Sequence, residues 1–248
     1  MMNTALIITS NPELESVSFL RAAAEQAGMK AKVAESYQKA DLVIHRKYGM
    51  DYSDLDIDVL QREGANTLNP VAFQRICRDK WIQHQWLLDN ELNALETYKL
   101  PNQPDKEGAW VLKTIRGMQG RGVTKFDSLE ELLISISSLK DQNYIVQKGL
   151  NFSSEFRCVF IGDRRFWFEK TGGNLFKGGS AQKVTRPGQR LEDMADVIFN
   201  QLSPRFAAVD FLEFEGELYP IDLNCYPGVE LIKDEMDSVV GMLKRAVK

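Results

Sequence analysis

Residues 206–228, with the sequence FAAVDFLEFEGELYPIDLNCYPG, have the pattern of two β-strands joined by a tight turn at 215–216. Period-two alternation places Asp222 and Asn224 on one face of the second strand, and antiparallel pairing can bring Asp210 beside them. Oxygen-bearing side chains are the ligands that hard divalent cations such as Mg²⁺ prefer. The segment therefore predicts a metal site, or else an ordinary turn, because Asn, Pro and Gly are common in turns.

Pro220 lies within the second of these strands. Proline has no N–H to donate to a neighbouring strand, so it occurs at sheet edges and at bulges. We therefore expect the second strand to lie at the edge of its sheet or to contain a bulge.

The composition excludes several classes of protein. The chain has 248 residues, 44% of them hydrophobic, which is enough for one large domain or two or three small lobes. The formal net charge of -4 gives no global basic field for nucleic acid. No apolar run approaches the roughly 20 residues that a membrane span needs, and the first residues lack the pattern of a signal peptide. We expect a cytoplasmic protein that binds neither nucleic acid nor membrane.

Histidine and cysteine provide no obvious metal centre. The three cysteines, Cys77, Cys158 and Cys225, are far apart and suggest neither a disulfide framework nor a metal site. The two histidines, His45 and His84, are too few for a histidine-rich centre, and we expect structural or surface roles for them.

The N-terminal part of the chain alternates strand and helix signals. Short apolar runs at 4–9, 30–35 and 40–46 predict strands, and the segments between and after them predict helices, the last one closed by Gly64. Such alternation indicates a small α/β unit with a parallel sheet, ending near residue 67.

The rest of the chain predicts one long helix followed by mixed helices and hairpins. Apolar spacing over 69–92 favours a single helix. Further helices are expected over 127–140, 191–202 and 229–247, and one more hairpin turns at 162–163.

A glycine-rich loop, RGMQGRG at 116–122, lies between two predicted strands. Its three glycines allow the backbone to approach a ligand, and Lys113 on the preceding strand adds a charge suited to phosphate. The spacing is neither that of a Walker P-loop nor that of a Rossmann fingerprint. The loop is either a cover over nucleotide phosphates or an ordinary hairpin loop.

A second polar, glycine-containing stretch, EKTGGNLFKGGSA at 169–181, also lies between strands. Asn174 and Lys177 offer donors to an anionic substrate or phosphate. The alternative is a surface loop.

Taken in order, five motifs over residues 64–230 resemble the ATP-grasp superfamily, in the branch of the RimK-type ligases, lysine-biosynthesis ligases and bacterial glutathione synthetase. They are GANTLNPVAFQRICRDKW, WVLKTIRGMQGRGV, YIVQKGLNFSSEFRCVFIGDR, NLFKGGSA and AAVDFLEFEGELYPIDLNCYPGVE. The resemblance implies an α+β and α/β architecture, with two α+β lobes that grip ATP after a small N-terminal α/β domain. The implied divisions are 1–67 for the N-terminal domain, 68–146 for the central lobe and 147–248 for the C-terminal lobe.

The resemblance also implies roles for individual residues. ATP would contact Lys80, Lys113, Gly117, Gln119, Gly120, Gly122, Gln147, Lys148, Gly149, Leu150 and Glu155. Mg²⁺, as one ion or two and with Mn²⁺ as a substitute, would bind Asp210, Asp222 and Asn224. The catalytic residues facing the acyl phosphate or substrate would be Arg157, Asn174 and Lys177.

The sequence departs from the family pattern at four places. Asp222 replaces a usual Glu, Lys148 replaces a common Glu, Glu155 replaces a usual Asp, and Glu169-Lys170 stands where Arg-rich residues are common. The substrate-side positions therefore follow the family less closely than the metal and phosphate positions.

The implied activity is ATP-dependent ligation of a carboxylate and an amine through an acyl phosphate, with an amino acid or peptide as amine. A peptide or protein acceptor and a homo-oligomeric assembly are further expectations. Two alternatives stay open from the sequence: a non-catalytic ATP-binding module, and a phosphotransferase that stops at a phosphorylated product.

Overall fold

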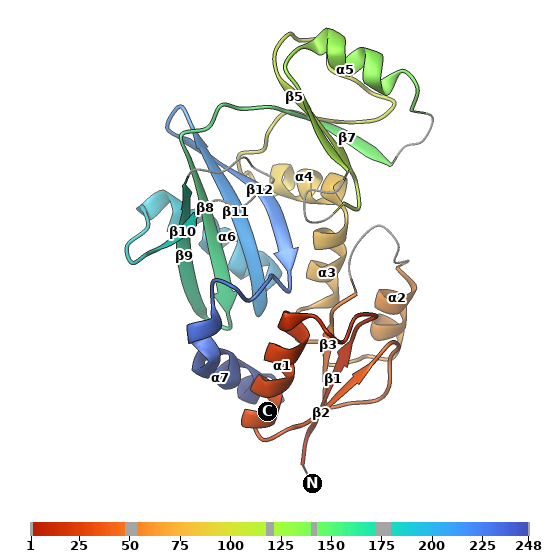
Figure 1. The fold of residues 1–248 in the computed structure, drawn as a ribbon, viewed down its shortest axis with the longest axis vertical. Coiled ribbons are helices and arrows are strands. Elements are labelled where there is room, and N and C mark those ends of the chain that lie inside the picture. The colour runs from red at the N-terminus through yellow and green to blue at the C-terminus, as the bar shows by residue number, and fades with distance from the viewer. Residues whose placement is uncertain (1, 48–53, 118–121, 140–142, 172–179, 248) are drawn as a thin grey trace.

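The computed structural model describes residues 2–47, 54–117, 122–139, 143–171 and 180–247, which form three β-sheets with flanking helices (Figure 1). The N-terminal sheet contains β1 (Thr4–Ile8), β2 (Lys30–Ala34) and β3 (Leu42–His45), all parallel, in the order β2-β1-β3. Helices α1 (Glu15–Gln26) and α2 (Leu55–Arg62) accompany this sheet. The predicted parallel α/β unit is confirmed.

The central sheet is antiparallel and has its own small core. It contains β4 (Thr97–Lys99), β5 (Trp110–Thr114), β6 (Val123–Phe126) and β7 (Tyr144–Lys148), in the order β4-β7-β5-β6. Helix α5 (Leu129–Ile136) begins where the Ser128 hydroxyl accepts a hydrogen bond from the N–H of Glu131. The buried core is formed by Leu100, Trp110, Leu112, Leu132, Ile136 and Val146.

The C-terminal sheet is antiparallel, with strand order β10-β9-β8-β11-β12. Its strands are β8 (Ser154–Ile161), β9 (Arg164–Thr171), β10 (Ser180–Val184), β11 (Phe206–Phe214) and β12 (Glu217–Cys225). Helix α6 (Gln189–Leu202) lies on one face, where Glu192 accepts a hydrogen bond from the Trp167 indole. The hairpin turns occur where the sequence predicts them, at 162–163 and 215–216.

One continuous core joins the first and last sheets. It includes Ile7 and Leu20 from the N-terminal unit, Phe73 from α3 (Val71–Arg78), and Phe160 and Val209 from the C-terminal sheet. The central sheet stands apart from this core in Figure 1, and its own buried cluster is separate. The division of the chain at residues 67 and 146 stays a prediction.

The effect of Pro220 is as the sequence predicts. β12 is the outermost strand of its sheet, and it also contains a bulge. Asp210 pairs with Asp222, but the next residue, Phe211, pairs with Pro220, so that Ile221 is the extra residue of the bulge. The strand is thus both an edge strand and a bulged one.

The prediction of one helix over 69–92 is wrong, because the helix is interrupted at Asp79. Helix α3 ends at Arg78, and α4 (Lys80–Asp89) begins at Lys80. Asp79 has extended backbone, and its carboxylate accepts hydrogen bonds from the N–H groups of Trp81 (2.9 Å) and Ile82 (3.0 Å). A side chain that caps a new helix in this way favours a break over continuation.

The prediction of a helix over 229–247 is wrong at its start. A 3₁₀ turn (Lys233–Glu235) precedes α7 (Met236–Ala246). Tyr226 has a left-handed backbone (φ 61°), and the N–H of Ile232 bonds the carbonyl of Val229 three residues earlier, as in a turn. Among the described residues, no helix is long and apolar enough to cross a membrane.

Candidate active site

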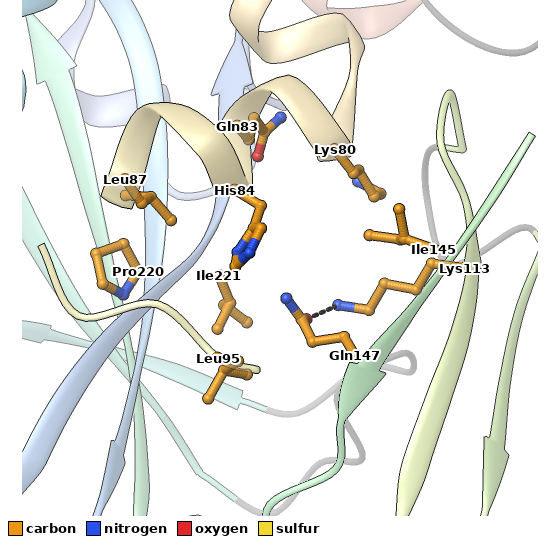
Figure 2. Close-up of a pocket in the computed structure, with 10 residues that line it drawn as sticks. All are labelled: Lys80, Gln83, His84, Leu87, Leu95, Lys113, Ile145, Gln147, Pro220 and Ile221. Carbon is orange, nitrogen blue, oxygen red and sulfur yellow. Dashed lines mark hydrogen bonds between the residues drawn. The ribbon is translucent and has the colours of Figure 1, made fainter. Parts of the chain in front are cut away.

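A cleft lies where α4, β12 and the central strands β5 and β7 meet (Figure 2). It contains about 330 Å³ of empty space, including the part open to solvent. The lining residues are Lys80, Gln83, His84, Leu87, Leu95, Lys113, Ile145, Gln147, Pro220 and Ile221.

Two lysines from different elements reach this cleft. The break at Asp79 places Lys80 at the first position of α4, and its backbone N–H bonds the carbonyl of Ile115 just after β5. Lys113 lies on β5 and donates a hydrogen bond to the Gln147 side chain on β7 (2.6 Å). Burial lowers the pKa of Lys113 to about 8, and the positive charge of Lys80 adds to this effect. A pair of cations at one end of a cleft suits the phosphates of a nucleotide.

The predicted metal ligands lie together in the C-terminal sheet. Asp210 on β11 is the cross-strand partner of Asp222 on β12. Asn224 lies two residues after Asp222, so all three side chains lie on one face of the sheet. The Asn224 amide donates a hydrogen bond to Asp222 (3.0 Å). The spatial arrangement expected from the sequence is present, while metal binding itself stays a prediction.

Cationic side chains neutralise both carboxylates. Lys80 Nζ lies 3.2 Å from an Asp222 oxygen, and Arg157 Nε and Lys170 Nζ each lie 3.3 Å from an Asp210 oxygen. Burial alone would raise the pKa of Asp222, but the nearby lysine charges hold it below its ordinary value. Ionised carboxylates and an amide oxygen on one face fit a hard cation such as Mg²⁺. Among the described residues, no three His, Cys, Asp or Glu side chains lie together in a group that could hold a metal ion.

The sheet register explains the position of the predicted catalytic Arg157. Arg157 on β8 is the cross-strand partner of Asp210, and Glu155, two residues earlier on the same face, is the partner of Lys170 on β9. Glu155 is buried and forms an ion pair with Lys170. The two departures from the family pattern, Glu155 and Lys170, are therefore in contact with each other.

The last two residues of β7 point to opposite faces of the central sheet. Gln147 points into the cleft, whereas the Lys148 ammonium lies 4.5 Å from the Trp110 ring centre and donates to the carbonyl of Glu107. Strand alternation thus directs the Lys148 side chain away from the cleft. The N–H of Gly149 bonds the carbonyl of Ala109, and Leu150 follows, partly buried, beyond the end of the strand.

Gly117 and Gly122, at the two ends of the glycine-rich loop, are both held by contacts with Thr114. Gly122 accepts a hydrogen bond from the N–H of Thr114, and its positive φ (+70°) leaves the Thr114 side chain where a Cβ would be, at 2.7 Å. Gly117 bonds back to the Thr114 carbonyl (3.3 Å), and the neighbouring Arg116 pairs with Asp54 (2.6 Å). Four predicted site residues lie outside the described part of the chain: Gln119, Gly120, Asn174 and Lys177.

A buried asparagine fixes the two metal-site strands at their ends. Asn69 accepts hydrogen bonds from the N–H groups of Arg205 (2.8 Å) and Phe206 (2.9 Å). It donates to the carbonyl of Phe206 (2.8 Å) and to the Cys225 sulfur (3.2 Å). Because β11 begins at Phe206 and β12 ends at Cys225, Asn69 holds the strands that carry Asp210 and the other predicted ligands.

The sequence did not indicate several cleft residues. His84, for which the sequence suggests a structural or surface role, lines the cleft together with Leu95 and Ile221. The spacing from Lys80 to His84 is four residues, which places both on one helix face and could have identified His84. Ile221 faces the cleft because it is the extra residue of the bulge. The sequence indicates that a bulge can occur in this strand but not at which residue.

The chain is similar in sequence to curated bacterial ligases. It is 28% identical over 220 residues to a "probable alpha-L-glutamate ligase" of Mannheimia succiniciproducens, with 78% of this chain and 71% of that one covered. A "probable alpha-L-glutamate ligase" of Legionella pneumophila is 26% identical, with 92% and 89% covered. No protein-family model matches the chain.

Solved structures of ligases have the same fold over nearly the whole chain. A D-alanine–D-alanine ligase from Bacillus anthracis superposes with a TM-score of 0.74 and 14% identity, and covers 100% of this chain and 99% of that one. A RimK domain ATP-grasp protein from Sphaerobacter thermophilus gives a TM-score of 0.76 and 15% identity, with 98% of each chain covered. The chain therefore has the ATP-grasp fold, and its sequence is similar to those of the probable alpha-L-glutamate ligases.

Proposed function

We propose that this protein is an ATP-dependent ligase that joins a carboxylate to an amine through an acyl phosphate. The observation that carries this function is the pair of cations in the cleft, Lys80 and Lys113, with Lys80 Nζ 3.2 Å from Asp222, whose cross-strand partner is Asp210. Such an arrangement suits a triphosphate whose charge is balanced by lysines on one side and by a metal ion on the other. The similarity to ligases across most of the chain supports the same chemistry.

The first half-reaction transfers a phosphoryl group. A carboxylate oxygen of the substrate attacks the γ-phosphorus of ATP, and the bond from that phosphorus to ADP breaks. Lys80 and Lys113 would bind the phosphates and hold them in line. Asp210, Asp222 and Asn224 would hold Mg²⁺, which when bound neutralises charge on the transferring group.

The second half-reaction forms the amide. The amine nitrogen attacks the acyl carbon, phosphate leaves, and the nitrogen loses a proton. In this structure Arg157 and Lys170 form ion pairs with Asp210, so they lie next to the place where the acyl phosphate would form. Both cations would be available to that phosphate if Asp210 held a metal ion.

The substrate proposal follows the relatives. Because they are named probable alpha-L-glutamate ligases, we propose an amino acid as the amine, with L-glutamate the first candidate, and the carboxyl group of a peptide or protein as the acceptor. We further propose a cytoplasmic location and a homo-oligomeric assembly.

A screen for ADP release tests the proposed function. The protein is incubated with ATP, Mg²⁺, amino acids and short peptides, and products are weighed by mass spectrometry. The proposal requires ADP release that depends on both the amine and the carboxylate, with a product heavier by one amide-linked residue. A product heavier by one phosphate would instead indicate a phosphotransferase, and ATP binding without amine-dependent ADP would indicate a binding module.

Matched variants complete this screen. Asp222→Asn removes a carboxylate from the candidate metal site and is expected to abolish ADP release. Glu215→Gln, at the exposed tip of the same hairpin, is the control and is expected to retain activity. Equal activity of the two variants would contradict the assignment of the metal site.

A further inference from the structure

His84 occupies a special position in the cleft wall. It lies one helical turn after Lys80 on α4, and both side chains line the cleft (Figure 2). The residue is only 9% exposed. Its Nδ1 atom is buried and has no hydrogen-bond partner among the described residues.

An unpaired buried nitrogen requires an explanation, because buried polar groups are nearly always hydrogen-bonded and leaving one unpaired costs free energy. Burial lowers the pKa of His84, which favours the neutral ring. A neutral imidazole has one nitrogen that donates and one that accepts. The ring also packs at a tilt against Trp81, with 5.4 Å between ring centres, which restricts its orientation.

The two amide side chains of the cleft, Gln83 and Gln147, are already paired. Gln147 accepts from Lys113 and donates to the Thr97 hydroxyl (3.1 Å). Gln83 exchanges hydrogen bonds with the backbone of Leu223 (3.1 and 3.3 Å). Within the described lining of the cleft, the buried polar atom that lacks a partner is therefore the His84 nitrogen.

The surroundings of His84 indicate the part of a ligand that it would meet. Lys80 and Lys113 mark the end of the cleft suited to phosphate. Away from the lysines the wall is apolar and suits a flat, largely apolar ring, whereas Ile145 lies beside the lysines (Figure 2). The apolar residues there are Leu87, Leu95, Pro220 and Ile221. His84 lies between these two regions on α4.

We propose that His84 recognises the purine ring of the nucleotide through a hydrogen bond at Nδ1 and so contributes to selection of the base. This inference rests on the proposed function, because it takes the nucleotide site of the ligase as given. It identifies a specificity residue that acts on binding and takes no part in bond formation.

The test measures dissociation constants by calorimetry for ATP and for analogues that each lack one polar atom of the base. The analogues are purine riboside triphosphate and the 1-, 3- and 7-deaza forms of ATP, and 2′- and 3′-deoxy-ATP report on the ribose. Wild-type protein is expected to bind one base analogue about tenfold more weakly than ATP, as loss of one buried hydrogen bond implies. His84→Leu is expected to bind ATP about tenfold more weakly and to lose discrimination against that same analogue.

Two further variants separate recognition from structure. His84→Asn keeps a polar atom near the position of Nδ1 and is expected to retain part of the discrimination. Gln85→Leu, on the exposed side of the same helix, is expected to bind every nucleotide as wild type does. Circular dichroism establishes that each variant is folded.

Several results would overturn the inference. One is discrimination among base analogues that is unchanged in the folded His84→Leu protein. Another is a loss of discrimination confined to the deoxy-ATP analogues, which would assign His84 to the ribose. Failure of the wild-type protein to bind ATP would refute the proposed function itself, whereas ATP binding with unaltered base selection in His84→Leu would refute only the role of His84.

Discussion

Binding of MgATP should be accompanied by uptake of a proton at Lys113. Burial and the charge of Lys80 lower the pKa of Lys113 to about 8. A phosphate placed against the ammonium group favours the charged form and raises this pKa. The free protein therefore contains partly neutral Lys113 at pH 8, and the complex contains charged Lys113.

The size of the effect follows from the pKa. At pH 8 about half of the Lys113 side chains are protonated, so binding should take up about 0.5 proton per ATP. The nucleotide contributes little, because the last phosphate pKa is about 6. The protonated fraction falls from about nine-tenths at pH 7 to about one-tenth at pH 9, so the affinity for ATP should fall about tenfold over this range.

Calorimetry in buffers with different ionisation enthalpies measures this proton uptake directly. Lys113→Arg carries a charge that is not lost in this pH range, so its proton uptake should vanish and its affinity should be nearly independent of pH. Lys125→Arg, on the exposed part of the neighbouring strand β6, serves as the control and should behave as wild type. Equal proton uptake by wild type and Lys113→Arg would refute the placement of phosphate beside Lys113.

Two further predictions concern the supports of the site. Asn69→Ala removes four buried hydrogen bonds and should lower the free energy of unfolding by about 3–5 kcal/mol, measured by urea denaturation. The exposed Asn66→Ala should cost about 1 kcal/mol or less, and similar losses in the two variants would contradict this account. Asp79→Ala and Ser128→Ala each remove a helix cap, worth about 1 kcal/mol. In titrations with ATP, only Asp79→Ala should also weaken binding, because its helix begins at Lys80.

Local signals in the sequence account for much of the site. Proline chemistry predicts that β12 is an edge strand or contains a bulge, and the strand has both features. Strand alternation with antiparallel pairing predicts that Asp210, Asp222 and Asn224 lie together, and in the register Asp210 pairs with Asp222. These features depend on neighbours along the chain or across one hairpin. Pattern reasoning succeeds where such short-range rules decide the geometry.

Features that depend on the meeting of distant elements could not be predicted. Apolar spacing continues through residue 79, so the pattern favours one helix, whereas capping by Asp79 and the bond from Lys80 to Ile115 divide it in two. The pairing of Lys170 with Glu155 depends on the register between β8 and β9. The burial of His84 depends on packing of α4 against β12 and the central sheet, which no local pattern encodes.

The central claim is that a substrate carboxylate is activated by phosphorylation, and oxygen isotope transfer tests it most directly. The carboxylate substrate is labelled with ¹⁸O at both oxygens and ligated in the presence of ATP and amine. Mass spectrometry should find one labelled oxygen in the released inorganic phosphate and the other in the amide for each bond formed. Amide formation with unlabelled phosphate would contradict the acyl-phosphate mechanism proposed for this protein.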